Sequence, residues 1–325
     1  MSQAGAKWVY VDLARGLAAL AVTAGHLRAF VLVDFKDVAQ PTLLCRAFYF
    51  ATSLGQQAVM VFFVMSGFLI GKSVYDNVST GQWSWSDYAI RRLSRLWTVL
   101  VPALIITAML DYIGVNFVHG ALYTGVTSDI YNSTPLAKDI PAIYRADTFF
   151  ANVFFLQTII APTFGTDLPL WSLSNEFWYY VIFPLGFLAV WGKGLTLQRI
   201  CYATVAAAVC IALPFGMVLY GIVWLFGFGV ALVSRSKRDA PQPVALSLSL
   251  LLFILTLVVA KLNTQWGAIN DFACGAAFAI TLYFLVSLKT RNSLITRFAR
   301  TSAGFSYTLY LTHFPMLALD RKSVV

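Results

Sequence analysis

The chain has 325 residues, of which 59% are hydrophobic and only 11% are charged. Soluble globular chains carry about 25% charged residues, so this composition excludes an ordinary soluble protein and indicates one that crosses a lipid bilayer several times. The formal net charge is +9 at pH 7, but the basic residues stand in short clusters between apolar runs. This pattern is typical of loops anchored at the cytoplasmic side of a membrane, so we expect the bilayer as a partner and no nucleic acid.

Nine apolar runs are candidate membrane spans, because a hydrocarbon core of about 30 Å takes about 20 helical residues. In chain order, they cover residues 10–33, 47–70, 96–113, 170–191, 200–214, 216–233, 244–260, 271–288 and 303–320. The sequence therefore predicts an all-α fold, a polytopic membrane helix bundle. It shows no internal repeat and no low-complexity linker, so we expect residues 1–325 to form a single integral-membrane domain.

The distribution of Lys and Arg predicts the orientation of these spans. With a cytoplasmic N-terminus, most of the basic residues fall in loops on the inside, as the positive-inside rule requires. The inside loops are then 71–95, 192–199, 234–243 and 289–302. A tenth apolar run, 148–160, is short, and a crossing there would place the last two of these loops outside. We therefore expect this run to be an interfacial or re-entrant piece of a long outer segment, 114–169.

The first span, VDLARGLAALAVTAGHLRAF, carries charged residues that are costly in lipid and are therefore candidates for a functional site. Arg15 and His26 are eleven residues apart, which at about 100° and 1.5 Å per residue places both on one face, about 16 Å apart along the helix. Arg15 then lies toward the cytoplasm and His26 in the outer half. Alternatively, Asp12 and Arg15 form a local i,i+3 pair and His26 is a packing residue. Arg28 lies near enough to the outer boundary to snorkel into it.

The chain's only glutamate, Glu176, falls in LPLWSLSNEFWYYVIFP, a few residues inside a span entered from the outer side. Its depth therefore matches that of His26. A carboxylate near an imidazole can orient the ring and stabilise the imidazolium that forms when it takes a proton. A helix N-terminal acid stabilised by the helix dipole is the other interpretation. His313 in GFSYTLYLTHFPML reaches about mid-depth and, with Tyr310 one turn earlier, is either part of a site or a polar contact between helices.

Two further features lie toward the cytoplasmic ends of spans. VFFVMSGFLIGKS places Ser66 and Gly67 toward the inner end of the second span, where small residues allow close helix packing or close approach of a ligand. DYAIRRLSRLW places Arg91, Arg92 and Arg95 at the inner start of the third span. This cluster is either a topology anchor or a phosphate site.

The inner end of the bundle thus has guanidinium groups suited to phosphates, and the outer end has a histidine and a carboxylate suited to proton transfer. An anionic donor held inside, with its reactive carbon reaching a base further out, requires this layout. A transporter or flippase of an anionic or sugar-linked substrate also places charged residues inside a bundle. Many such transporters consist of inverted repeats, which the sequence does not show. A regulatory membrane component without activity is a third interpretation.

Five stretches occur in one order between residues 12 and 315: DLARGLAALAVTAGH, FFVMSGFL, RRLSRLW, LWSLSNEFWYY and SYTLYLTHFP. They resemble the motifs of the acyltransferase-3 family of bacterial integral-membrane O-acyltransferases, among them Arg-x10-His, F-F-x-x-S-G-F-L and W-S-L-x-x-E-x-x-[FY]-Y. Each motif is weak alone, whereas five in order are specific. Thr98 departs from the family, which usually has a proline there. Family members typically have ten spans, so either a further span follows residue 325 or the end of the chain is atypical.

The resemblance implies transfer of an acyl group, often acetyl, from a cytoplasmic acyl-CoA to a hydroxyl of a cell-surface carbohydrate or glycolipid. It implies a multi-pass protein of the bacterial inner (plasma) membrane, with acyl-CoA as co-substrate and no metal. His26 matches the histidine proposed as catalytic, and we expect it to act as general base. Arg15 matches the first-span arginine needed for activity. The expected catalytic residues are His26, Glu176 and His313, and the expected acyl-CoA contacts are Arg15, Arg92, Arg95 and Ser66.

Two expectations concern the route of the acyl group and its destination. No Ser or Cys has a convincing neighbouring base in the sequence, so we expect direct transfer from donor to acceptor rather than an acyl-enzyme. The outer segment 114–169 contains Tyr123, Tyr131 and Tyr144, and its position on the outer side predicts that it contacts the acceptor.

Overall fold

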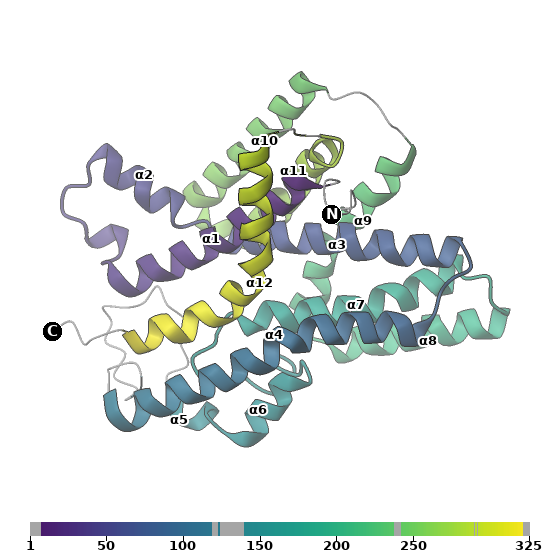
Figure 1. The fold of residues 1–325 in the computed structure, drawn as a ribbon, viewed down its shortest axis with the longest axis horizontal. Coiled ribbons are helices and arrows are strands. Elements are labelled where there is room, and N and C mark those ends of the chain that lie inside the picture. Colours follow the sequence, from purple (N-terminus) through teal and green to yellow (C-terminus); the bar gives the residue numbers. More distant parts are fainter. Residues whose placement is uncertain are drawn as a thin grey trace. The chain divides into compact units, whose positions relative to one another are not determined.

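The computed structural model describes residues 8–118, 123, 140–236, 242–288, 290 and 292–320 (Figure 1). Within these residues the regular structure is helical, and the only β-type contact is an isolated bridge between Gln157 and Ala161. The all-α prediction is therefore confirmed. The loop charges predicted at Lys237, Arg238, Lys289 and Arg291, and residues 321–325, lie outside the described residues.

Nine helices in the described part of the chain have 17 or more residues, and each coincides with one predicted span. They are α1 (Val9–Val31), α3 (Gly55–Ser79), α4 (Trp85–Ile113), α7 (Leu170–Trp191), α8 (Thr196–Ala212), α9 (Phe215–Ser236), α10 (Pro243–Leu262), α11 (Ala268–Leu285) and α12 (Ser293–Asp320). The shorter elements are η2 (Phe35–Asp37), α2 (Leu43–Ala51), η3 (Gly114–Val118), α5 (Ile140–Ile143), α6 (Ala146–Val153) and η5 (Thr264–Trp266).

Five helical stretches of the described chain are long and apolar enough to cross a membrane. They are Leu43–Ser79, Trp85–Val118, Phe215–Ser234, Pro243–Leu262 and Ala268–Leu285. The helix α8 is apolar but has only 17 residues, and polar side chains such as Arg15 and Glu176 lower the hydropathy of α1 and α7. The polytopic helix bundle is confirmed, whereas the count of nine spans stays a prediction.

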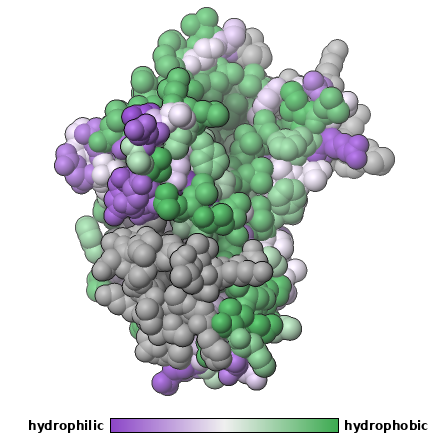
Figure 2. All heavy atoms as spheres, turned by 90° about the vertical axis from the view of Figure 1, so that its left-hand side faces the viewer, coloured by the Kyte–Doolittle hydropathy of each residue, from purple (hydrophilic) through white to green (hydrophobic). Residues whose placement is uncertain are grey.

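The surface of the described residues is apolar over wide areas, as one face shows in Figure 2. The helix α10 presents Leu248, Leu251 and Ile254 with exposed fractions of 61%, 53% and 51%. A soluble helix hides such side chains in a core, so a helix that leaves them uncovered is suited to a lipid environment.

The ends of three helices differ from the predicted spans. Thr52 is the C-cap of α2, Thr52 and Ser53 donate side-chain hydrogen bonds to the carbonyls of Phe48 (2.8 Å) and Phe50 (2.9 Å), and α3 begins at Gly55. Ser66 therefore lies eleven residues after the start of α3 and thirteen before its end, near the middle of the helix rather than toward its inner end. The helix α4 begins at Trp85, so its arginines lie inside it and not at its start.

The helix α12 begins at Ser293, ten residues before the predicted span. Asn292 explains this start, because its side-chain oxygen accepts hydrogen bonds from the backbone N–H groups of Leu294 (2.9 Å) and Ile295 (3.1 Å). Asparagine is a favoured helix N-cap because it satisfies backbone donors that the first turn leaves free.

The run 148–160 does not form a spanning helix, as predicted. The helix α6 ends at Val153, and Phe155 and Thr158 then take positive φ values of 59° and 65°, which are incompatible with a continuing α-helix. The side chain of Asn152 fixes the return of the chain, because it donates to the carbonyl of Pro162 (3.0 Å) and accepts from the N–H of Phe164 (3.1 Å).

The chain forms two compact units that are each built from three separate segments. The first unit contains Met1–Ala18, Gln57–Arg92 and Asn175–Gly304, and the second contains Ala19–Gln56, Leu93–Ser174 and Phe305–Val325. The divisions fall within α1, α4, α7 and α12 and near the start of α3, so the units alternate along the chain instead of following one another.

Glycines bring helix backbones into direct contact in the first unit. A Cβ atom on Gly67 of α3 would lie 1.8 Å from the carbonyl oxygen of Trp224, and one on Gly227 of α9 would lie 1.9 Å from that of Val64. The two helices therefore interlock through reciprocal glycines, as small residues permit in membranes. The sequence predicted either close helix packing or close approach of a ligand at Ser66 and Gly67, and Gly67 takes part in helix packing.

Candidate active site

Two histidines from opposite ends of the chain form a hydrogen-bonded pair in the second unit. Nδ1 of His26 on α1 lies 2.7 Å from Nε2 of His313 on α12. The two rings are nearly parallel, with an interplanar angle of 9° and centroids 5.0 Å apart. The predicted site residues His26 and His313 are thus brought together, although 287 positions separate them in the sequence.

The second hydrogen bond of His313 determines where the protons lie in this pair. Nδ1 of His313 is 2.9 Å from the carbonyl oxygen of Leu309, and a carbonyl only accepts, so this Nδ1 carries the proton. Neutral His313 then has its lone pair on Nε2, and His26 must donate to it from Nδ1. Neutral His26 consequently has its own lone pair on Nε2. This tautomer is that of a general base oriented through its other nitrogen, the arrangement of base and orienter in hydrolytic triads.

Aromatic packing holds the histidine pair in place. The ring of Phe314 meets the ring of His26 edge-on at a centroid distance of 4.9 Å, and Phe30 packs against Phe314 at 5.1 Å. His313 is buried, with an exposed fraction of 4%, whereas His26 is partly exposed. The orienting histidine is therefore shielded from solvent, while the histidine that would take the substrate proton is accessible.

Tyr310 connects α12 to the start of α7 close to this pair. Its hydroxyl lies 2.7 Å from that of Ser172, and its ring lies 6.2 Å from the ring of His313. The polar contacts between helices that the SYTLYLTHFP stretch suggested are thus present: Tyr310 joins α12 to α7, and His313 joins α12 to α1.

Glu176 lies in a separate polar cluster in the first unit. Its Oε1 accepts hydrogen bonds from the hydroxyls of Ser66 (2.9 Å) and Tyr180, and Oγ of Ser66 accepts from Nε1 of Trp224 (3.2 Å). We call these four residues the Glu176 cluster. The cluster joins α3, α7 and α9 through hydrogen bonds that converge on one carboxylate and one serine hydroxyl.

These contacts change the roles expected for Glu176 and Ser66. The hydrogen-bond partner of His26 is His313, whereas Glu176 bonds to Ser66 and Tyr180, so a role of Glu176 in orienting His26 stays a prediction. Ser66 has a carboxylate within hydrogen-bond distance, which the sequence did not reveal because 110 positions separate the two residues. The motif resemblance singled out both residues, but no pattern along the chain predicts their contact.

The arginines expected at the donor side have different surroundings. Nη1 of Arg15 lies 3.5 Å from Oδ1 of Asp12, so the local i,i+3 pair is present. The guanidinium carbon of Arg92 lies 5.6 Å from the centre of the Tyr88 ring, within cation–π range. Arg95, also on α4, is exposed. The guanidinium of Arg28 lies 5.0 Å from the centre of the Tyr49 ring, so it packs against α2, and its place at the outer boundary stays a prediction.

Two tyrosines of the predicted outer segment donate hydrogen bonds within the second unit, and contact of this segment with an acceptor stays a prediction. Tyr123 is buried (4% exposed) and donates to Oδ1 of Asp111 at 3.4 Å, and Tyr144 donates to the carbonyl of Ala108 at 2.8 Å. Topology alone suggested acceptor contacts, and it carries no information on whether a side chain faces outward. Tyr131 lies outside the described residues.

An acid pair lies next to Tyr123. Asp111 accepts two hydrogen bonds from Thr166, from its N–H and from its hydroxyl, both at 2.8 Å. Asp167 is fully buried, and neither of its carboxylate oxygens has a hydrogen-bond partner among the described residues. Burial, together with the charge of Asp111, raises the pKa of Asp167 well above its usual range.

Comparison with known proteins identifies the family of this chain. The family model of the acyltransferase domain of acyltransferase-3 proteins matches residues 8–322. The chain belongs to the acyltransferase-3 family. It is therefore a membrane O-acyltransferase, and the histidine pair lies within the matched domain.

Two curated acyltransferases are similar to this enzyme. An O-acetyl transferase of Shigella phage Sf6 is 23% identical over 277 residues, which cover 81% of this chain and 74% of the relative. The acyltransferase MdmB of Streptomyces mycarofaciens is 30% identical over 208 residues, or 62% of this chain and 44% of the relative. An uncharacterised Haemophilus influenzae protein is 30% identical over 135 residues, or 41% of this chain and 49% of its own length. This acyltransferase thus spans about half the length of the last two relatives. No solved structure matches it.

Proposed function

We propose that this acyltransferase moves an acyl group, in the simplest case acetyl, from a cytoplasmic acyl-CoA to a hydroxyl of a cell-surface carbohydrate or glycolipid. The observation that carries the proposal is the histidine pair, which gives His26 a fixed tautomer with its lone pair on Nε2. The family and the acetyl- and acyltransferase relatives support the reaction class. Charge-based topology supports a cytoplasmic donor and an acceptor at the outer face of the inner membrane.

The chemistry proceeds in two proton-coupled steps. Nε2 of His26 takes the proton of the acceptor hydroxyl while the hydroxyl oxygen attacks the thioester carbonyl. The tetrahedral intermediate then expels the CoA thiolate, which receives the proton from Nε2 of His26. The acceptor gains an ester, CoA leaves as a thiol, and the histidine returns to its starting state.

His313 stabilises the charge that forms on His26 during the first step. The imidazolium keeps its Nδ1–H pointed at Nε2 of His313, and the carbonyl of Leu309 fixes the other nitrogen of His313. His313 is therefore a positioning residue and His26 the catalytic residue.

Substitution of His26 tests the proposal directly. The variant His26→Asn keeps a donor toward His313 but lacks a base, and it should lose acyl transfer by about 10²–10⁴-fold, the usual contribution of a general base. The assay uses the purified protein in nanodiscs with labelled acetyl-CoA and candidate glycans, and thermal unfolding controls for the fold. Undiminished transfer by a folded variant would remove His26 from the mechanism.

A further inference from the structure

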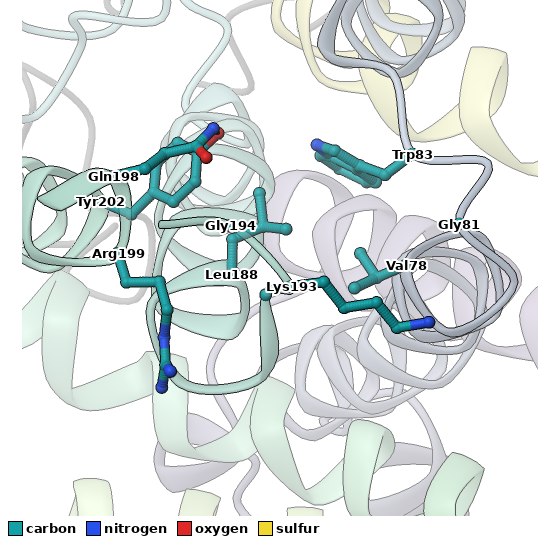
Figure 3. Close-up of a pocket in the computed structure, with 10 residues that line it drawn as sticks. Val78, Gly81, Trp83, Leu188, Lys193, Gly194, Gln198, Arg199 and Tyr202 are labelled. Carbon is teal, nitrogen blue, oxygen red and sulfur yellow. The ribbon is translucent and has the colours of Figure 1, made fainter. Parts of the chain in front are cut away.

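A small pocket opens in the first unit where two predicted cytoplasmic loops meet (Figure 3). It lies at the end of α3, the end of α7 and the start of α8, and its volume is about 180 Å³. The residues that give it chemical character are Trp83, Lys193, Gly194, Gln198 and Tyr202. None of them belongs to the five family-like motifs.

The polar groups of the pocket are arranged around an aromatic surface. Figure 3 shows the indole of Trp83 pointing across the pocket toward Gln198 and Tyr202. The Nε1–H of Trp83 is buried and has no hydrogen-bond partner among the described residues. Nε2 of Gln198 donates to the Tyr202 hydroxyl at 3.0 Å, which fixes the plane of the amide. A buried donor without a partner is costly, so it points to a ligand acceptor.

The two cations that line the pocket differ in their availability. The side chain of Arg199 points away from the pocket and donates to the carbonyls of Ala189 (2.9 Å) and Val190 (2.8 Å), so it caps the C-terminal end of α7. Lys193 stands in the loop between α7 and α8 and extends along the pocket toward Gly81. Lys193 is therefore the cation placed to meet an anionic ligand.

Gly194 leaves room for the Gln198 amide at the side of the pocket formed by the start of α8. A Cβ atom on Gly194 would lie 2.2 Å from Oε1 of Gln198, so a larger residue there would displace the amide. The helix α8 starts at Thr196, and its N-cap Leu195 makes no side-chain cap. The first N–H groups of α8 therefore add a positive partial charge to the same wall as Lys193.

We propose that this pocket binds the adenine nucleotide end of the acyl-CoA donor, an inference that rests on the function proposed above. The adenine ring stacks on Trp83, a sequence-tolerant way of holding bases, and its edge meets the amide of Gln198, as Gln does with adenine in nucleic acids. Lys193 contacts a phosphate, and a ribose or phosphate oxygen at the edge of the indole accepts from the Nε1–H of Trp83. A volume of about 180 Å³ is below that of sites for whole ligands, about 300–1,000 Å³, and suits one end of a long donor.

A series of contacts leads from the pocket to the Glu176 cluster within the first unit. The ring centres of Trp83 and Tyr88 are 5.1 Å apart, and the guanidinium of Arg92 lies over the Tyr88 ring. The Tyr88 hydroxyl donates to the carbonyl of Tyr180 at 2.9 Å, and Tyr180 belongs to the Glu176 cluster. A donor anchored by its nucleotide in the pocket thus has Arg92 beside it for a second phosphate.

The test compares two donors that differ only in the nucleotide. Acetyl-CoA carries it, and S-acetylpantetheine lacks it. With the protein in nanodiscs, Lys193→Ala and Trp83→Ala should each raise the KM for acetyl-CoA by about tenfold, with kcat unchanged, because each removes one contact to the nucleotide. Neither variant should change the rate with the short donor. Lys36→Ala, which removes an exposed lysine of the other unit, should change neither value.

A binding measurement separates this inference from the function on which it rests. Adenosine 3′,5′-bisphosphate should bind the wild-type protein in calorimetry, and about tenfold more weakly to Lys193→Ala. An 8-azido derivative should crosslink to the peptides that contain Trp83 or Tyr202. Binding without transfer from either donor would refute the proposed function and leave the pocket assignment standing. Equal KM values in all variants, equal losses with both donors, or crosslinks to other peptides would overturn the pocket assignment.

Discussion

The histidine pair makes a quantitative prediction for the variant His313→Ala. The 2.7 Å hydrogen bond to His26 strengthens when His26 becomes positively charged, and hydrogen bonds to charged groups contribute about 1.5–3 kcal/mol. The neutral bond already exists in the resting enzyme, so only its gain in strength, about 1–1.5 kcal/mol, lowers the barrier, and at about 1.36 kcal/mol per factor of ten its loss should lower kcat by about 5- to 13-fold. The KM for acetyl-CoA should hardly change, since His313 acts on the base and not on the donor.

Two companion variants distinguish orientation from a general loss of structure. His313→Gln keeps an acceptor for Nδ1–H of His26 but no imidazole, so it should retain more activity than His313→Ala. Thr312→Ala removes the neighbouring side chain on α12, whose hydroxyl bonds only to the carbonyl of Thr308 at 2.9 Å, and should change kcat by less than about threefold. Initial rates with labelled acetyl-CoA in nanodiscs provide the comparison.

A double-mutant cycle gives the result that would refute this mechanism. If His313 acts only through His26, its substitution has nothing left to remove once His26 is absent, and the double variant should be no slower than His26→Ala alone. An equal loss from His313→Ala with and without His26 would show that the two residues act independently. A kcat unaffected by His313→Ala would show that the hydrogen bond has no catalytic role.

Three further predictions follow from other parts of the structure. Gly227→Ala forces a Cβ to 1.9 Å from the α3 backbone and should cost about 1–3 kcal/mol in detergent unfolding, whereas Gly229→Ala, with open space two residues later, should be neutral. Burial raises the pKa of Asp167, so the free energy of unfolding should fall as pH rises from the pKa of this carboxyl in the unfolded chain to its pKa in the folded protein. Asp167→Asn should remove this pH dependence and raise the melting temperature at neutral pH. The control Asp147→Asn, at an exposed position, should do neither. Direct transfer predicts that protein incubated with labelled acetyl-CoA alone, and denatured afterwards, carries no covalent label. A labelled ester on Ser66 would disprove direct transfer.

Local sequence patterns predicted the helices and the short-range contacts. Apolar runs located all nine long helices, because their length and composition reflect the bilayer, and spacing along one helix predicted the Asp12–Arg15 pair. Helix ends were less predictable, since they depend on single capping side chains such as Thr42 and Asn292 that bond to the backbone. Each of these residues also has common roles elsewhere, so its presence alone does not locate an end.

Long-range contacts set the limit of what the sequence could reveal about the site. The resemblance singled out His26 and His313 as separate motif positions, but only the folded chain shows that the two rings are hydrogen-bonded to each other. Glu176 illustrates the same limit, because its depth matched that of His26 while its hydrogen bonds go to Ser66 and Tyr180. Depth is a one-dimensional coordinate, and it leaves the facing direction of a side chain undetermined.

The alternation of the two units along the chain restricts how this protein can vary in length. A residue inserted or deleted between Arg15 and His26 would turn one end of α1 by about 100° relative to the other, although each end is packed in its own unit. The same restriction applies to α4, α7 and α12, which also carry residues of both units. Relatives should therefore differ in length at loops such as 80–84 and 192–195, whereas the helices that carry residues of both units should keep a constant length.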